Sequence, residues 1–228
     1  MSYLFVPAER PSVDVEGRAE RFPVHRIYCV GRNYAAHARE MGKDPDREPP
    51  FFFTKPADAI APNRSVIPYP PRTKNFHHEV ELVVALGAGG RDLTSDRALD
   101  HVFGYAVGID WTRRDLQFEA RDKGRPWDTG KAFDRSASIT AIRPASACGH
   151  IRSGAISLAV NGEVRQQGDI AELIWSVPEL IAELSTLFEL VAGDLIYTGT
   201  PAGVGPVRPG DRIEGMVEGL PALSATIA

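Results

Sequence analysis

One stretch of the chain decides the fold: HHEVELVVAL, residues 77–86. Apart from one glutamate, its last seven residues are apolar and rich in valine, which predicts a buried strand. Successive side chains of a strand point to opposite faces, so Glu79 and Glu81 should point the same way, about 7 Å apart. Two carboxylates on one face of an apolar strand repel each other and are costly to desolvate, and a bound cation removes both penalties. The alternative is a solvated sheet face that carries both glutamates.

A second strand is predicted at residues 103–110, FGYAVGID, where large and small residues alternate. Gly104, Ala106 and Gly108 share one face of this strand, and their small size lets another element approach closely. Asp110 ends the strand on that face and is either a third metal ligand or a strand-end or capping residue. Three carboxylates with waters suit Mg²⁺ or Mn²⁺, whereas zinc normally recruits histidine or cysteine. His77 and His78 precede the strand and rank below the carboxylates as ligands.

A short helix is predicted in NYAAHAREMG, residues 33–42, with Asn33 as its N-cap and Gly42 as its stop. His37 and Glu40 lie three residues apart and therefore on one side of it. A carboxylate beside a histidine can orient and charge the ring for general base catalysis. An exposed surface pair is the alternative interpretation. The loop that follows, residues 44–50, has the charges and prolines of a mobile flap.

Elsewhere the pattern predicts many short strands and few helices. Residues 57–75 are rich in proline and predict an irregular segment. Strands outnumber helices and do not alternate with them regularly, which favours an α+β fold dominated by β structure over a doubly wound sheet. Further strands are expected at residues 25–31 and 51–56, with a hairpin at residues 156–168 that turns at Asn161-Gly162.

Two helices carry capping signals. The first should begin at Thr112, with Asp115 completing a capping box, and end at Gly124. The second should begin with a capping box formed by Ser176 and Glu179. Its apolar stripe is expected to pack into the core and consists of Leu180, Ile181, Leu184, Leu187 and Phe188.

Composition bounds the class of protein. The 228 residues are 43% hydrophobic, enough for a single catalytic domain at residues 25–228 preceded by an arm or edge strand at residues 1–24. The net charge of -4 gives no reason to expect nucleic acid or an anionic membrane as a partner. The first residues do not predict a signal peptide, and no apolar run approaches the roughly 18 residues of a membrane helix. Cys29 and Cys148 lie far apart, which predicts a reducing, cytoplasmic location.

Taken together, these pieces resemble the fumarylacetoacetate hydrolase family, in particular its short branch of acylpyruvate hydrolases. Within that branch the stretch around residues 44–60 is most like the fumarylpyruvate hydrolases of bacteria. The matching motifs occur in family order from about residue 25 to the end. They are VGRNYAAHAREM (30–41), FTKP (53–56), HHEVEL (77–82), GYAVGIDWTRRDLQ (104–117), GKAFD (130–134), VNGEVRQ (160–166) and GDLIYTGTPAGVG (193–205).

The resemblance implies a mixed β-sandwich roll, as in the C-terminal domain of fumarylacetoacetate hydrolase, and a homodimer. It implies a Mg²⁺ or Mn²⁺ ion as cofactor and a small oxo acid as substrate. The implied metal ligands are Glu79, Glu81 and Asp110; the implied catalytic residues are His37, Glu40 and Lys131; the implied substrate contacts are Arg114, Gln117 and Thr200, with Lys131 at the same end of the substrate.

The expected activity is metal-dependent hydrolysis of a C–C bond in a 2,4-dioxo acid, with fumarylpyruvate giving fumarate and pyruvate. In this mechanism His37 takes a proton from water, which attacks the C4 carbonyl, and a pyruvate enolate leaves. The same enolate forms when oxaloacetate loses CO₂, so oxaloacetate decarboxylase is the alternative activity. A non-catalytic protein that binds oxo acids is a third possibility, against which the intact pair His37 and Glu40 argues.

Overall fold

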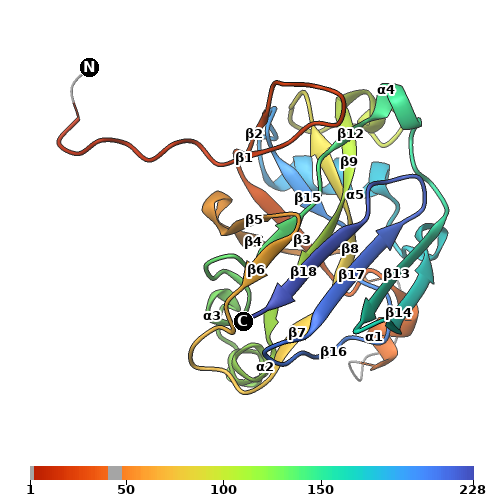
Figure 1. Ribbon diagram of the computed structural model, residues 1–228. Helices are drawn as coiled ribbons and strands as arrows, with labels where there is room; N and C mark the ends of the chain where they lie inside the picture. Colours follow the sequence, from red (N-terminus) through yellow and green to blue (C-terminus); the bar gives the residue numbers. More distant parts are fainter. Residues whose placement is uncertain (1–2, 41–47) are drawn as a thin grey trace.

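The computed structural model describes residues 3–40 and 48–228, and of residues 38–40 it describes the backbone only. Two curled β-sheets pack against each other, with short helices around their ends (Figure 1). The larger sheet runs in the order β4-β3-β15-β8-β9-β11-β5, with β12 also paired to β9. Its strands are β3 (Ile27–Gly31), β4 (Phe51–Lys55), β5 (Ile60–Pro62), β8 (Val80–Leu86), β9 (Val102–Asp110), β11 (Ala137–Ile139), β12 (Arg143–Pro144) and β15 (Leu195–Tyr197).

The second sheet runs in the order β14-β13-β17-β18-β6, and two smaller sheets complete the β structure that the described residues form. Its strands are β6 (Ser65–Ile67), β13 (Ala155–Val160), β14 (Glu163–Asp169), β17 (Arg212–Val217) and β18 (Leu223–Ile227). One smaller sheet contains β7 (Phe76–His78), β10 (Thr112–Arg113) and β16 (Gly205–Pro206); the other pairs β1 (Ser12–Val13) with β2 (Phe22–Pro23).

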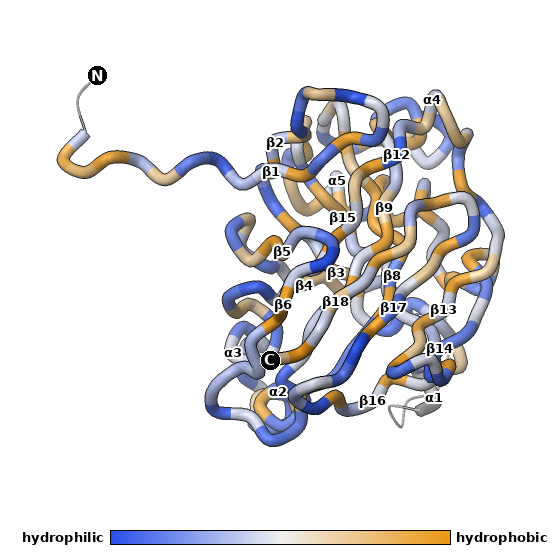
Figure 2. Tube along the Cα trace, in the orientation of Figure 1, coloured by the Kyte–Doolittle hydropathy of each residue, from blue (hydrophilic) through white to orange (hydrophobic). Residues whose placement is uncertain are grey.

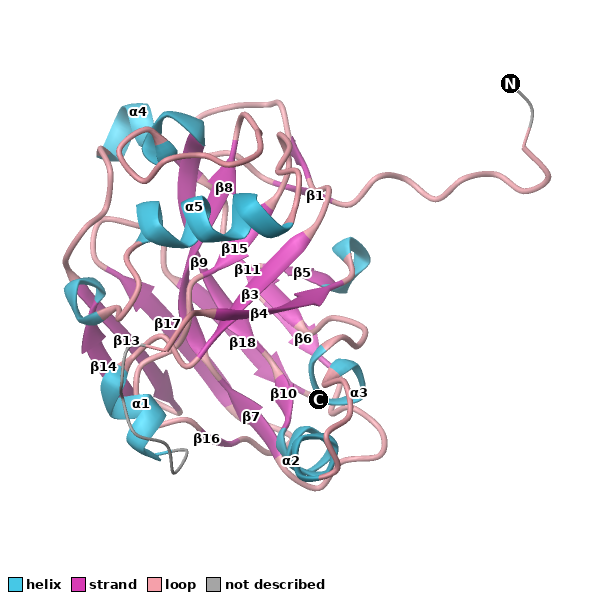
Figure 3. Ribbon diagram, turned by 180° about the vertical axis from the view of Figure 1, so that it is seen from behind, coloured by secondary structure: helices cyan, strands magenta, loops and turns pink. Residues whose placement is uncertain are grey.

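Helices are short and peripheral (Figure 3). None of those among the described residues has both the length and the apolar character needed to cross a bilayer. The α-helices are α1 (Ala35–Glu40), α2 (Arg114–Asp122), α3 (Asp128–Lys131), α4 (Ala145–Cys148) and α5 (Val177–Leu187), and the 3₁₀ helices are η1 (Ala57–Ala59), η2 (Ala98–His101) and η3 (Ile170–Glu172). The predicted α+β class with dominant β structure is confirmed, and parallel pairs such as β3 with β15 make the larger sheet mixed.

The β8 strand has a different apolar core on each face. Val80, Leu82 and Val84 lie in the larger core, which also holds buried residues of β13, β17 and α5. Val83 lies in the smaller core, which includes the β1–β2 hairpin. Glu81 shares the face of Val83 because side chains alternate along a strand. The predicted alternation therefore holds from residue 80 onward and puts one glutamate on the face opposite the larger core.

The N-terminal arm, residues 3–11, runs away from both sheets (Figures 1 and 2). Leu4, Phe5 and Val6 are 80–94% exposed, so this apolar stretch contributes nothing to the packed cores. The β1–β2 hairpin then joins the body, where Val15 forms a bridge to Ile142. An arm and a short strand pair thus both occur within the first 24 residues.

Gly108 confirms the expected close approach on the small-residue face of β9. A Cβ added there would lie 2.5 Å from the ring of Tyr197 and 2.5 Å from Val83 Cγ2. The Tyr197 ring is fully buried, and its hydroxyl donates to the carbonyl of Ser138 at 3.0 Å. The ring cannot withdraw without breaking that hydrogen bond.

Replacing Gly108 with alanine is therefore expected to lower the free energy of unfolding by about 1–3 kcal/mol through overpacking. Urea denaturation of the wild type and the variant measures the change. Gly215→Ala on β17 is the matched control, because its added Cβ would lie 3.3 Å from Val80 Cγ2, a tight contact that a shift of a few tenths of an ångström relieves. Equal losses in the two variants would contradict the packing argument.

Several predicted local structures are confirmed. The hairpin turns at Asn161-Gly162 with both φ angles positive, as a type I′ turn requires. Gly124 follows the end of α2 with a φ of 62°. The capping box of Ser176 and Glu179 opens α5.

Other local predictions are wrong. In each case the residue pairs with a distant segment of the chain in place of capping the helix. Thr112 belongs to β10 and does not cap α2. Asp115 accepts hydrogen bonds from the Thr73 hydroxyl and the Lys74 amide, on the loop beside the helix. The Asn33 side chain does not cap α1, because its oxygen accepts from the Trp175 backbone amide at 2.8 Å while its NH₂ group donates to the carbonyls of Trp175 and Thr198.

The predicted strand at residues 77–86 is in fact two strands, because the chain changes sheets at Glu79. Residues 57–75 are less irregular than expected and contain β5 and β6. The outer end of the α5 stripe is not core, since Leu187 and Phe188 are 57% and 37% exposed. Gly42 and most of the predicted flap lie outside the described residues.

Candidate active site

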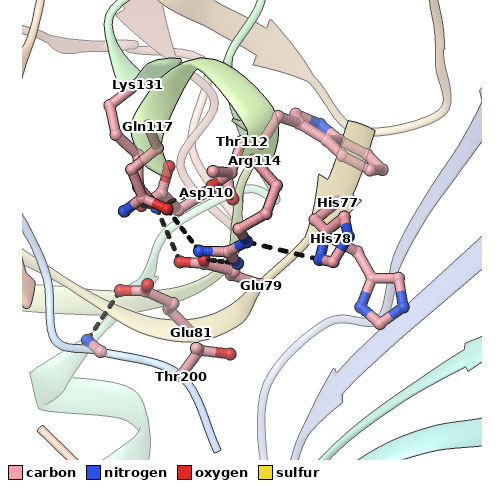
Figure 4. Close-up of polar contacts among 12 residues, drawn as sticks. His77, His78, Glu79, Glu81, Asp110, Thr112, Arg114, Gln117, Lys131 and Thr200 are labelled. Atoms are coloured by element: carbon pink, nitrogen blue, oxygen red, sulfur yellow. Dashed lines mark hydrogen bonds and ion pairs between the residues drawn. The ribbon is translucent and has the colours of Figure 1, made fainter. Parts of the chain in front are cut away.

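Three carboxylates from three backbone positions meet in the interior (Figure 4). Glu79 lies between β7 and β8, Glu81 lies on β8, and Asp110 ends β9. Strand pairing brings them together: the Asp110 amide donates to the Glu79 carbonyl at 2.9 Å, and Glu81 pairs with Gly108 in the β8–β9 register. One oxygen from each lies within 4.8 Å of the others, and all three residues are 5% exposed or less.

Lys131 bonds to two of these carboxylates. Its Nζ lies 2.8 Å from Glu79 Oε2, 2.6 Å from Asp110 Oδ2 and 2.7 Å from the Thr112 hydroxyl. The lysine ends α3, and the residue before it, Gly130, allows that helix to touch α2. A Cβ at Gly130 would lie 2.8 Å from the backbone nitrogen of Gln117. The sequence Gly130-Lys131 thus sets the lysine close to the acidic cluster.

Two further cations pair with carboxylates of the cluster. The Arg114 guanidinium pairs with Glu79. Lys55, at the end of β4, places its Nζ 2.8 Å from Asp110 Oδ1 and also donates to the Trp111 carbonyl at 3.3 Å. Only 2% of each cationic residue is exposed, so these ion pairs lie in the interior, where water screens them weakly.

The neighbouring charges determine the pKa shifts of Glu79 and Lys131. Burial favours the neutral acid, yet the positive charges of Lys131 and Arg114 outweigh it and hold the pKa of Glu79 well below its usual range. Burial likewise favours a neutral amine, but Asp110 and Glu79 raise the pKa of Lys131 above its ordinary value. Glu79 is therefore a carboxylate and Lys131 an ammonium at neutral pH.

Glu81 is the carboxylate without a basic partner among the side chains that the structure describes. Its Oε2 accepts a hydrogen bond from the Gly199 amide at 2.7 Å. Burial, followed by the negative charges of Asp110 and Glu79, raises the pKa of Glu81 well above its usual value. A divalent cation beside this carboxylate offsets both causes, and an all-oxygen donor set suits Mg²⁺ or Mn²⁺. The residues therefore fit the metal that the sequence predicts.

The predicted substrate residues line one pocket together with Glu79 and Glu81 of the acidic cluster. Gln117 and Thr200 are at most 4% exposed, and His37 on α1 is 5% exposed. The Gln117 carbonyl accepts from Arg114 Nη1 at 2.5 Å, and the Thr200 hydroxyl accepts from Gln166 Nε2 at 2.7 Å. The backbone of Glu40 ends α1, but its side chain lies outside the described part, so its pairing with His37 stays a prediction.

His77 and His78 do not join the acidic cluster. His77 Nε2 lies 2.8 Å from the Asn75 side-chain oxygen, and His78 Nδ1 lies 2.8 Å from the Gln166 side-chain oxygen. Burial, together with the positive charge of Arg114, lowers the pKa of His77 to about 4. The carboxylate cluster contains neither histidine. That these histidines rank below the carboxylates as metal ligands stays a prediction.

Sequence reasoning missed Lys55 and the Gly199 amide. A signal for Lys55 was present, because a lone lysine closes the apolar strand FFFTK and a buried lysine needs an acidic partner. The partner, Asp110, lies 55 residues along the chain, so the sequence alone did not identify it. The Gly199 contact depends on how the glycine-rich loop after β15 approaches β8, and no residue type signals that.

Comparison with known proteins places the chain in a family. Residues 26–228 match the fumarylacetoacetate (FAA) hydrolase C-terminal family, and the chain belongs to that family.

Individual relatives extend over most of the chain. A fumarylpyruvate hydrolase of Ralstonia sp is 48% identical over 189 residues, 82% of this chain and 98% of that protein. The mitochondrial oxaloacetate tautomerase of Homo sapiens is 43% identical over 198 residues, 87% of this chain and 89% of that protein. The crystal structure of fumarylpyruvate hydrolase from Pseudomonas aeruginosa in complex with Mn²⁺ and pyruvate has a TM-score of 0.98 at 55% identity, covering 100% of this chain and 99% of that chain.

Proposed function

We propose that this protein is a metal-dependent hydrolase that cleaves the C3–C4 bond of an acylpyruvate, with fumarylpyruvate giving fumarate and pyruvate. The observation that carries the proposal is a buried cluster of three carboxylates, two of which, Glu79 and Glu81, line a pocket that His37 also lines. Support also comes from two relatives named fumarylpyruvate hydrolases, one of them complexed with Mn²⁺ and pyruvate.

In this proposal Glu79, Glu81 and Asp110 hold Mg²⁺ or Mn²⁺. When bound, the ion supplies Lewis acidity beside the oxo-acid end of the substrate. Lys131 and Arg114 fix the ionised form of Glu79 and add positive charge at the same end of the pocket. Gln117 and Thr200 line that end and offer polar groups to the substrate's carboxylate and 2-oxo oxygen.

His37 acts as the general base and Glu40 orients it. The imidazole accepts a proton from water as the water oxygen attacks C4. The C3–C4 bond then breaks, and its electron pair passes into the enolate of pyruvate. The proton returns from the imidazolium to C3. Fumarylpyruvate dianion and water thus yield fumarate, pyruvate and one released proton. Lys131 and Arg114 stabilise the negative charge that develops at the oxo-acid end.

Oxaloacetate is the alternative substrate, and one observation favours it: the human relative is named an oxaloacetate tautomerase. Decarboxylation of oxaloacetate yields the same pyruvate enolate, so the residues that stabilise it serve both reactions. The two activities differ in whether water reaches C4. The position of His37 in the pocket wall favours delivery of water and therefore hydrolysis.

A substrate panel tests the proposal. We expect kcat/KM for fumarylpyruvate to exceed that for oxaloacetate by at least about tenfold, since only the hydrolytic reaction uses the base. Both are measured on one preparation with saturating Mn²⁺, with acetylpyruvate as a short acylpyruvate for reference. A clear preference for oxaloacetate would replace the proposed activity with the alternative.

We also propose that the enzyme is a cytoplasmic homodimer, with residues 25–228 as its catalytic domain. The free state of both cysteines accords with a reducing compartment. Light scattering behind a sizing column distinguishes a dimer of 24.9 kDa chains from a monomer.

A further inference from the structure

One wall of the pocket is a row of aromatic rings in contact with one another. A buried cation lies against the ring at its inner end, and a partly exposed cation lies against the ring at its outer end. At the inner end, Lys131 Nζ lies 5.1 Å from the centre of the Phe53 ring. Phe53 packs against Trp127 at 5.8 Å, and Trp127 packs edge-on against Phe51 at 5.4 Å. At the outer end, the Arg32 guanidinium lies 5.1 Å from the centre of the Phe51 ring. All five residues line the pocket that Glu79 and Glu81 also line.

A second wall repeats this order on α2. Arg114, at the inner end, lies 5.7 Å from the centre of the Phe118 ring. Arg121 lies 4.4 Å from the same ring and is exposed at the surface end of the helix. Both arginines and the phenylalanine line the same pocket. Each wall therefore has a cation at its inner end, aromatic surface in the middle and an arginine at its outer end.

The inner and outer cations differ in their carboxylate partners. Lys131 and Arg114 are bound to Glu79. Arg32 pairs with no carboxylate among the side chains that the structure describes. Arg121 bonds to Asp122 at 2.9 Å, but this pair is solvent-exposed and weak. The outer arginines are thus available to an anion in the pocket, whereas the inner cations serve the acidic cluster.

We propose that Arg32 and Arg121 bind a second carboxylate, at the far end of the substrate, and so select dianionic acylpyruvates over those with a neutral acyl tail. The inference rests on the proposed function and names its substrate class. A ligand that matches both walls has a negative charge at each end and a flat, apolar middle that stacks against aromatic rings. A conjugated dicarboxylate such as fumarylpyruvate has this form.

The test compares fumarylpyruvate with acetylpyruvate, which has the same reacting group and a methyl group in place of the distal carboxylate. The readout is the ratio of kcat/KM for fumarylpyruvate to kcat/KM for acetylpyruvate, with saturating Mn²⁺. We expect Arg121→Gln to lower this ratio about tenfold or more, because a charge-assisted hydrogen bond made only by the dianion is lost. Arg32→Gln should lower it in the same direction.

Arg97→Gln is the matched control, because Arg97 is an exposed arginine with a neighbouring aspartate and lies outside the pocket. It should leave the ratio unchanged. The inference is overturned if neither Arg121→Gln nor Arg32→Gln alters the ratio, or if both substrates lose the same factor. A wild-type enzyme that hydrolyses neither substrate overturns the proposed function itself and this inference with it.

Discussion

Replacing Glu81 with alanine is expected to abolish divalent-cation binding and, with it, turnover. Glu81 is the cluster carboxylate without a basic partner among the described side chains, so a cation gains most from it. Glu79 and Asp110 remain in the variant, but Lys131 already bridges them. A site reduced to two lysine-bound carboxylates has too little unbalanced negative charge to hold a divalent ion.

Thermal unfolding with and without Mn²⁺ measures this effect. A cation at 100 times its Kd stabilises the native state by roughly 2.7 kcal/mol. For a chain of this size that corresponds to a rise in Tm of about 5–10 °C in the wild type. The Glu81→Ala variant should show no rise, whereas Glu214→Ala, at an exposed position on β17, should match the wild type. An equal rise in the Glu81 variant would mean that the ion binds elsewhere.

Replacing His37 with alanine is expected to separate hydrolysis from binding. His37 lies on α1 and outside the carboxylate cluster, yet it lines the same pocket. Removing a general base typically lowers the rate by about 10²–10⁴-fold, so kcat for fumarylpyruvate should fall by that factor. The metal site and the cations at the inner end of the pocket stay intact, so affinity for the oxo-acid end should persist.

Calorimetric titration with oxalate, a mimic of the pyruvate enolate, checks the second half of this prediction. With Mn²⁺ present, the His37→Ala variant should bind oxalate within roughly 1–2 kcal/mol of the wild type, the scale of one hydrogen bond. His150→Ala, at an exposed histidine, is the control and should retain both kcat and oxalate binding. Loss of metal in the His37 variant would make that histidine a ligand, and an unchanged kcat would place the base elsewhere.

The acidic cluster was predictable because it depends on local geometry. Alternation along one strand places Glu81 opposite the valines and leucine of the larger core, and small residues mark the face of β9 that ends in Asp110. The roles of Lys131 and Arg114 came from the resemblance, since no spacing rule connects them to the cluster. For His37, its spacing to Glu40 already suggested general base catalysis, and the resemblance connected that pair to the cluster. Their positions in the structure agree with it, while their catalytic roles remain proposals.

What the sequence did not reveal depends on contacts between distant segments. The break at Glu79 arises because β7 and β8 pair with different sheets. Asn33 is a residue type that commonly caps helices, but its side-chain oxygen accepts from the Trp175 backbone amide, far along the chain. The row of aromatic rings from Lys131 to Arg32 includes rings on β4 and beside α3, and it exists only once those elements pack together.

The most direct test of the central claim is hydrolysis of fumarylpyruvate in ¹⁸O-labelled water by metal-stripped enzyme, before and after addition of Mn²⁺. The account predicts no turnover until Mn²⁺ is added, then equimolar fumarate and pyruvate, with one ¹⁸O atom in the new carboxylate of fumarate. It would be contradicted by turnover that chelation does not abolish, or by Mn²⁺-restored enzyme that yields no labelled fumarate.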